Sequence, residues 1–265
     1  AIKVLAPFIN NFKKNRKRGG LYKMQVQNKE PILKLSNVGK SFGGLRAVDE
    51  VDLVIRKGEL HCLIGPNGAG KSTIFKMIMG IFDPSDGQIL YKGKSLAHMK
   101  KWDGFKEGIS IKMQVPGVFG DLTVYENLRI AAQRTYSKKA LEEKINYLLE
   151  EFNLTHLKGE TVNNLSHGQQ QSLEMGMAIA NDPTLLLLDE PVAGMGPEET
   201  QFISNLIKKI NNNGITILFI DHDMEFVRSL AQQVTVLHLG KKFAEGTIED
   251  IENNEKVVEI YLGQS

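Results

Sequence analysis

Residues 65–73 place the strongest constraint on the fold. The segment GPNGAGKST follows a mostly apolar run, LHCLIG at 60–65, and leads into STIFKMIMG at 72–80. The apolar run predicts a strand that is buried on both faces, and the segment after the glycines predicts a helix. Glycines let successive backbone N–H groups close around phosphate oxygens, which side chains would obstruct. We therefore expect an α/β fold that binds the phosphates of a nucleotide at the N-terminus of this helix.

Within this loop, two side chains have predicted roles toward the nucleotide. Lys71 is expected to reach the β- and γ-phosphates, and the Ser72 hydroxyl is expected to bind Mg²⁺. The predicted ATP-contacting residues of the loop are Gly65, Pro66, Asn67, Gly68, Ala69, Gly70, Lys71, Ser72 and Thr73.

Two further apolar runs end in residues that suit phosphate chemistry. LLLLDEP at 185–191 predicts a buried strand with Asp189 and Glu190 at its carboxyl end, where ligand sites of parallel sheets form. Asp189 suits the Mg²⁺ shell, and Glu190 can polarise the attacking water. ITILFID at 215–221 predicts a third strand that leads into His222, which can hydrogen-bond a γ-phosphate and hold the water.

The segment LSHGQ at 165–169 predicts a second anion site. Ser166 is a natural helix N-cap, Gly168 leaves the backbone bare, and glutamines fill the first turn where an acid is the common choice. The phosphates held by the first loop already have a helix N-terminus of their own. We therefore expect a head-to-tail pair, in which Ser166, Gly168 and Gln169 of one chain meet the γ-phosphate held by the other.

Composition and charge describe a globular chain with a basic beginning. The chain has 265 residues, 42% hydrophobic and 24% charged, and no apolar run approaches the length of a membrane span. A single cysteine, Cys62, allows no internal disulfide and favours a reducing compartment. Residues 1–29 hold eight cations and no acid, which suits anionic lipid or nucleic acid, or else a solvated lead-in.

Together these motifs resemble the ATP-binding cassette ATPases over about residues 31–265. The resemblance implies that Gln114 is the glutamine that touches Mg²⁺ and couples to the membrane partner. It also implies that Phe42 stacks on adenine, and that Glu190 and His222 act with Gln114 in hydrolysis. ATP and Mg²⁺ are then the ligands of the site.

The resemblance also predicts how the chain is organised. We expect an α/β P-loop NTPase sheet core with a small antiparallel β subdomain, formed by residues 30–96 and 181–265. Residues 97–180 are expected to form an inserted α-helical subdomain that carries the signature motif, and residues 1–29 a basic tail. The segment 115–124 is expected either to dock the permease or to fill the core.

Two positions depart from the family pattern. His167 stands where the signature usually has glycine, and either points to solvent or donates to the phosphate. Gly196 stands where the loop after Glu190 usually has aspartate, which puts the usual cross-dimer aspartate contact in question.

LSHGQQQSLEMGMAIANDPTLLLLDEPVAGM is similar to ATPases of importers for branched-chain amino acids and, more closely, for urea and short amides. This similarity implies a peripheral protein on the cytoplasmic face of the inner membrane. Its expected partners are two permease subunits, a second ATPase subunit (identical or paralogous) and, indirectly, an external substrate-binding protein, with no nucleic acid.

Two other function classes remain open beside the importer. One is the ATPase of a lipid or lipopolysaccharide exporter or extractor. The other is a non-transport relative, in DNA repair, chromosome structure or translation. DNA-repair and chromosome relatives carry long coiled-coil arms between the phosphate loop and the signature, whereas only about 90 residues without sustained heptads intervene here. Translation relatives usually carry two cassettes in one chain, and this chain has one.

Overall fold

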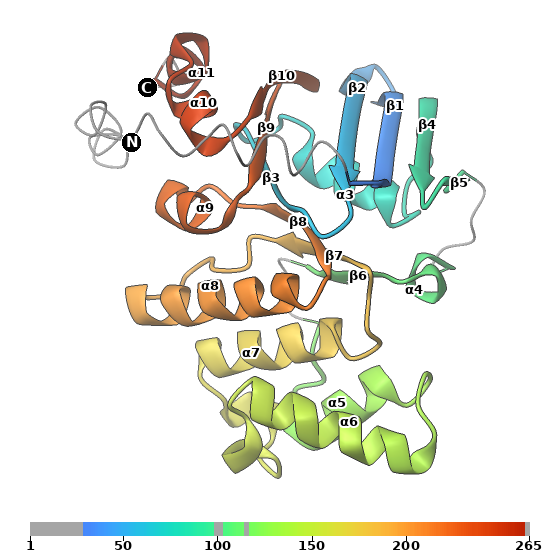
Figure 1. Cartoon of the computed structure of the whole chain (residues 1–265), viewed down its shortest axis with the longest axis vertical. Coiled ribbons are helices and arrows are strands. Elements are labelled where there is room, and N and C mark those ends of the chain that lie inside the picture. Colours follow the sequence, from blue (N-terminus) through green and yellow to red (C-terminus); the bar gives the residue numbers. More distant parts are fainter. Residues whose placement is uncertain (1–28, 98–102, 114–116, 263–265) are drawn as a thin grey trace.

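The computed structural model describes residues 29–97, 103–113 and 117–262 (Figure 1). The basic tail, apart from Lys29, and Gln114 lie outside the described residues. The elements form an upper part with two sheets and a lower, helical part, and the six-stranded sheet ends between them (Figure 1). Two sheets with helices around them confirm the expected P-loop type of α/β fold.

The main sheet has six strands, of which five are parallel and β10 is antiparallel. In spatial order they are β10 (Lys241–Gly246), β9 (Gln233–His238), β3 (Leu60–Ile64), β8 (Thr216–Ile220), β7 (Leu185–Asp189) and β6 (Ile109–Lys112). The central strands are mostly apolar runs because both faces of the sheet are covered. Along β7, Leu186 and Leu188 pack into one hydrophobic core, and Leu185 and Leu187 pack into the other.

Helices from different parts of the chain cover the two faces of this sheet. One face packs against α3 (Lys71–Ile78), whose Ile74, Phe75, Met77 and Ile78 are buried. The other face packs against α8 (Pro197–Asn212) and α9 (Met224–Leu230). The chain then continues through α10 (Ile248–Glu252) and α11 (Glu255–Leu262).

A second, antiparallel sheet packs over α3. Its strands, in spatial order, are β2 (Leu45–Arg56), β1 (Pro31–Phe42), β4 (Asp86–Tyr91) and β5 (Lys94–Ser95). β1 and β2 form a hairpin in which Phe42 pairs with Leu45 across a two-glycine turn. This hairpin brings Phe42 close to the loop that follows β3.

Residues 97–180 contain helices and one strand of the main sheet. The helices are α4 (Asp103–Glu107), α5 (Val124–Ala132), α6 (Lys138–Glu151) and α7 (His167–Ala178), with 3₁₀ turns at Thr155–Leu157 and Val162–Asn164. The strand β6 pairs in parallel with β7, from Ile109 opposite Leu185 to Lys112 opposite Leu188. The expected helical subdomain, residues 97–180, therefore also contains β6, a four-residue strand that forms one edge of the main six-stranded sheet.

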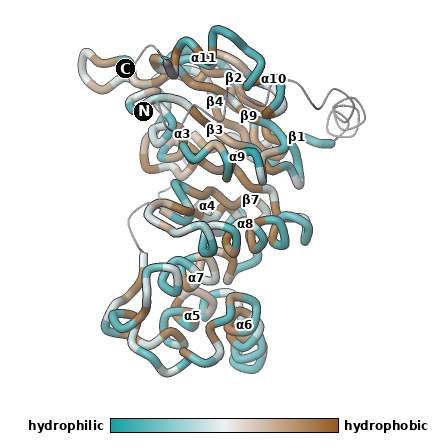
Figure 2. The backbone as a smooth tube through the Cα atoms, turned by 90° about the vertical axis from the view of Figure 1, so that its left-hand side faces the viewer, coloured by the Kyte–Doolittle hydropathy of each residue, from teal (hydrophilic) through white to brown (hydrophobic). Residues whose placement is uncertain are grey.

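The hydropathy of the residues agrees with this arrangement of sheets and helices. Figure 2 shows hydrophobic stretches around β7 and mixed hydrophobic and hydrophilic stretches along α6. In α6 the apolar positions Leu141, Ile145, Leu148 and Leu149 are buried at helical spacing. No helix in the described part of the chain is long and apolar enough to cross a bilayer.

Candidate functional site: a nucleotide pocket

A pocket of about 470 Å³ opens where the loop after β3 meets the carboxyl ends of β7 and β8. It combines the phosphate loop, the hairpin of the antiparallel sheet and the acid pair after β7. The residues that line it are Phe42, Leu45, Ala47, Asn67, Gly68, Ala69, Gly70, Lys71, Ser72, Thr73, Asp189, Glu190 and Ile220. Three sequence motifs far apart in the chain therefore meet at one site.

The backbone of the phosphate loop requires glycine at two positions. Gly65 has φ 150°, and a Cβ added there would lie 2.2 Å from the carbonyl oxygen of Leu237. Gly70 has φ 100°, and its added Cβ would lie 2.7 Å from the carbonyl oxygen of Ala47. Any side chain at these positions would displace the neighbouring strands, so the loop keeps its close fit and its exposed N–H groups.

Lys71 is held at the base of the pocket by the loop itself. Its Nζ donates hydrogen bonds to the carbonyl oxygens of Gly65, at 2.7 Å, and Pro66, at 2.9 Å. Burial lowers the pKa of Lys71, and the charges of Glu190 and Asp189 act in the opposite direction. The helix α3 has no acid in its first turn, so its positive end and this ammonium both face the pocket.

Ser72 and Asp189 line the same pocket and offer the oxygen ligands that Mg²⁺ prefers. Burial raises the pKa of Asp189, and the negative charge of Glu190 raises it further. A divalent cation would offset both effects, so the residues present fit the metal. Across the described ranges no group of three or more His, Cys, Asp or Glu could hold a metal. A cation here would therefore share its coordination between a few protein oxygens and the nucleotide's phosphates.

Glu190 and His222 lie side by side at the pocket edge. Glu190 has φ 48°, and its backbone N–H donates to the carbonyl oxygen of Ile220 at 2.9 Å. His222 Nδ1 lies 3.6 Å from Glu190 Oε1, and the His222 side chain is 75% exposed. The structure thus brings together two residues from different strands that the sequence assigned to the same reaction.

Asp221 supports this arrangement and was not among the predicted site residues. Its side chain is buried, and Oδ1 accepts the backbone N–H groups of His222 at 2.8 Å and Asp223 at 3.0 Å. Burial raises the pKa of Asp221. The sequence does place this acid directly after an apolar strand. The same pattern is also expected for a simple turn residue, so the sequence alone could not identify Asp221 as part of the site.

Phe42 stands at the mouth of the pocket. Its ring is in edge contact with Phe82, with ring centroids 5.0 Å apart, and the residue remains 40% exposed. Lys40 Nζ lies 5.3 Å from the centroid of the Phe42 ring. An exposed aromatic ring beside a phosphate loop is available for stacking on a base.

The signature residues lie at the start of α7, outside this pocket. Ser166 Oγ accepts the backbone N–H of Gln169 at 3.3 Å, and Gln169 Oε1 accepts the backbone N–H of Ser166 at 2.9 Å. The Gln169 side chain is therefore engaged in a capping box within its own chain. None of the described residues 165–169 lines the pocket, and α7 lies well below α3 in Figure 1.

An acid does lie near the signature, although none is present in its own first turn. A Cβ added to Gly168 would lie 2.3 Å from Glu199 Oε1, in the first turn of α8. The Glu199 side chain therefore lies against Gly168 and would have to move if this residue carried a side chain. The sequence pattern around 165–171 could not show this, because Glu199 is about 30 residues away along the chain.

His167 is exposed, and its donation to a phosphate on a partner subunit stays a prediction. Its Nε2 lies 3.3 Å from the carbonyl oxygen of Ala193, in the loop that follows Glu190. A carbonyl oxygen only accepts, so the imidazole donates its Nε2–H to this loop. Glycine, the usual residue of the family at this position, could not make the contact.

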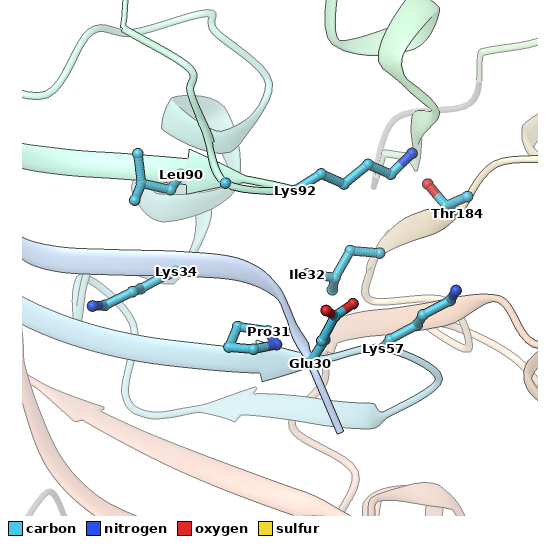
Figure 3. A pocket seen from close by; sticks show the side chains of 9 residues that line it. Glu30, Pro31, Ile32, Lys34, Lys57, Leu90, Lys92 and Thr184 are labelled. Carbon is cyan, nitrogen blue, oxygen red and sulfur yellow. The ribbon is translucent and has the colours of Figure 1, made fainter. Parts of the chain in front are cut away.

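A second hollow, of about 640 Å³, lies beside the start of β1 and the end of β4 (Figure 3). The side chains of Lys57 and Lys92 extend toward the same side of this hollow, and Glu30 also lines it (Figure 3). Lys92 Nζ already donates to the backbone carbonyl of Glu107 at 3.0 Å. This hollow contains none of the predicted nucleotide residues.

The site is that of an ATP-binding cassette, and the comparisons with known proteins agree. Residues 48–193 match the ABC transporter family. The chain therefore belongs to the ABC transporter family as an ATP-binding subunit. It binds and hydrolyses ATP, associates with a membrane and has a permease as its partner.

Individual relatives match almost over their full length. The chain is 33% identical over 252 residues to BraF, a high-affinity branched-chain amino acid transport ATP-binding protein of Pseudomonas aeruginosa, covering 89% of this chain and 99% of BraF. It is 33% identical over 235 residues to LptB, a lipopolysaccharide export system ATP-binding protein of Haemophilus influenzae, covering 88% and 98%. The solved structure of MJ1267 in its ADP conformation superposes with a TM-score of 0.80 at 30% identity, covering 89% and 100%.

Proposed function

We propose that the chain hydrolyses ATP to drive an importer for branched-chain amino acids, or for urea and short amides. The similarity to BraF supports this proposal most, because it extends over 99% of the length of BraF. The urea and amide alternative rests on the resemblance of LSHGQQQSLEMGM and the segment after it. Lipopolysaccharide export is the second candidate, and the similarity to LptB supports it.

In this proposal the phosphate loop holds the triphosphate. The N–H groups of residues 65–73 and the positive end of α3 surround the phosphates, and Lys71 moves its hydrogen bonds from the loop carbonyls to the β- and γ-oxygens. Phe42 stacks on the adenine. Mg²⁺, held by Ser72 and Asp189, would neutralise developing charge on the phosphate oxygens.

Glu190 accepts a proton from the attacking water, and His222 hydrogen-bonds the γ-phosphate. The 3.6 Å separation of His222 Nδ1 from Glu190 Oε1 supports a shared role at one reacting group. Asp221 fixes the backbone that carries His222 through its two accepted N–H bonds. We also propose a role for Gln114 in contacting the metal, although it lies outside the described residues.

The pocket is completed by a second ATPase subunit. This step rests on the location of the signature, since Ser166 and Gly168 do not line the pocket of their own chain. In a head-to-tail pair, identical or paralogous, these residues meet the γ-phosphate bound by the other subunit. Glu199 lies beside Gly168, at the edge of that contact. Its negative charge disfavours binding of the γ-phosphate there, and cations or the positive end of the helix would have to offset this repulsion.

The permease docks on the segment after Gln114. Phe119 is 50% exposed, which supports docking, whereas Val118 packs against the core. We infer two permease subunits, an external substrate-binding protein and a position on the cytoplasmic face of the membrane. We keep the division into a core of 30–96 and 181–265 and a subdomain of 97–180, with β6 joining the two.

One experiment separates these candidates. The chain is purified with its partners from its native membrane, the complex is reconstituted in vesicles, and ATPase stimulation and transport are measured with leucine, urea, acetamide and lipopolysaccharide. Stimulation by leucine or by the small amides supports the importer. Stimulation by lipopolysaccharide alone would replace it with the exporter.

A further inference from the structure

One carboxylate of the signature helix contacts two other segments of the chain. Glu174 lies two turns after the start of α7, and Oε1 accepts the backbone N–H of Gly117 at 2.7 Å. Its Oε2 lies 3.7 Å from Nζ of Lys112, the last residue of β6. The side chains of Lys112 and Glu174 are 2% and 5% exposed, so the two charges meet in the interior, whereas Gly117 is exposed.

The charge of Lys112 connects this contact with the nucleotide pocket. Lys112 Nζ has no hydrogen-bond partner among the described residues. Burial lowers the pKa of Lys112, and the charges of Glu174, Asp189 and Asp221 raise it. Burial raises the pKa of Glu174, and the charge of Lys112 and the hydrogen bond from the Gly117 N–H act in the opposite direction.

The next residues along the chain lead from this contact to the surface. Phe119 donates its backbone N–H to Asn127 Oδ1 at 2.8 Å, and Asn127 Nδ2 donates to the carbonyl oxygen of Phe119 at 3.0 Å. Asn127 is fully buried on α5. Residues 117 and 119 are thus attached to two helices of the subdomain, while the Phe119 side chain remains exposed.

We propose that Glu174 is a positioning residue that makes the signature helix and residues 117–119 move as one body. The proposal rests on the proposed transport function and deepens it. When the signature meets a γ-phosphate on the partner subunit, α7 carries Gly117 and Phe119 with it. Closure at the nucleotide thereby reaches the permease through the hydrogen bond between Glu174 and Gly117.

Two matched double variants test this bond. Lys112→Met with Glu174→Gln removes both buried charges but keeps an oxygen that can accept the Gly117 N–H. Lys112→Met with Glu174→Leu removes both charges and the acceptor. Neither variant leaves an unpaired buried charge, so the acceptor for Gly117 is the principal difference between them.

The readouts are ATP binding, ATPase kinetics and transport in the complete reconstituted complex. We expect equal ATP KM and equal nucleotide binding in both variants, because the phosphate loop is untouched. The Leu variant should have about tenfold lower kcat and transport per ATP hydrolysed than the Gln variant, because it leaves the Gly117 N–H without an acceptor.

Equal kcat and transport in the two variants would overturn the proposal. If the Leu variant fails to fold, Gly117→Pro removes the donor instead of the acceptor, and the same loss is expected. Retained coupling in that variant would again contradict the role. Absence of substrate-stimulated ATPase in the wild-type complex would contradict the proposed transport function, and is distinguishable because it affects every variant alike.

Discussion

At the scale of single residues, neighbouring carboxylates in the pocket have different surroundings. Asp189 is half-buried and lines the pocket together with Ser72, whereas Glu190 turns toward His222 with a left-handed backbone, φ 48°. The sequence placed both acids at the end of a buried strand and assigned them separate roles. It could not supply the φ of Glu190 or the 3.6 Å approach of His222, since these depend on the contact between β7 and β8.

Glu190→Gln should keep ATP binding and reduce turnover by about 10²- to 10⁴-fold, because the amide cannot accept the proton of the attacking water. The measurement is single-turnover hydrolysis together with equilibrium nucleotide titration. Hydrolysis at the wild-type rate would remove Glu190 from the role of general base.

Asp221→Asn should change how stability depends on pH. The folded-state pKa of Asp221 is raised by burial, so the native state holds this proton more tightly than the unfolded chain does. Ionised Asp221 therefore costs stability at neutral pH, and this cost disappears as the pH falls through the folded pKa.

We expect wild type to gain stability relative to Asp221→Asn as the pH falls from about 7 to about 4, the ordinary pKa of Asp, measured as free energies of unfolding in urea. A difference between the two proteins that stays constant over this range would show that Asp221 has no raised pKa in the folded state.

At the scale of elements, the apolar runs predicted the central strands because their composition already reflects burial on both faces. LLLLD at 185–189 and TILFI at 216–220 are strands in the structure. The four-residue strand β6 escaped prediction, because a short run without periodicity gains its structure from pairing with β7. Gly168 also lies against Glu199, and His167 contacts Ala193. Both contacts join segments far apart in the sequence, so no local sequence pattern could predict them.

Substitutions in β7 should show that both faces of this strand are core. Leu186→Ala and Leu187→Ala should each destabilise the fold by about 2–5 kcal/mol, since each leucine is fully buried in a different hydrophobic cluster. Leu45→Ala is the matched control, because Leu45 is 67% exposed and the same change there should cost under about 0.5 kcal/mol.

Chemical denaturation of the three variants measures these costs. A low cost for only one of Leu186 and Leu187 would show that β7 has a solvated face, which would contradict the layered sheet.

At the scale of the whole molecule, the two anion-binding helix starts are separated. The phosphate loop and the start of α3 form the pocket, and the start of α7 lies outside it among the helices of the lower part (Figure 1). The sequence predicted two separate anion sites, because it contains two helix N-termini suited to anions and one phosphate loop. We propose that one chain contains two halves of different sites, and that a second subunit completes each half.

ATP-driven association of the Glu190→Gln variant tests this central claim most directly. Light scattering is recorded for the chain alone and together with a second ATPase subunit of the same transporter, with and without ATP and Mg²⁺. Lys71→Ala is the control, because it removes the ammonium that should hold the β- and γ-phosphates. The account predicts that ATP doubles the particle mass of Glu190→Gln in at least one of these mixtures and leaves Lys71→Ala unchanged. An unchanged mass of Glu190→Gln in both mixtures at saturating ATP would contradict a site completed by a second subunit.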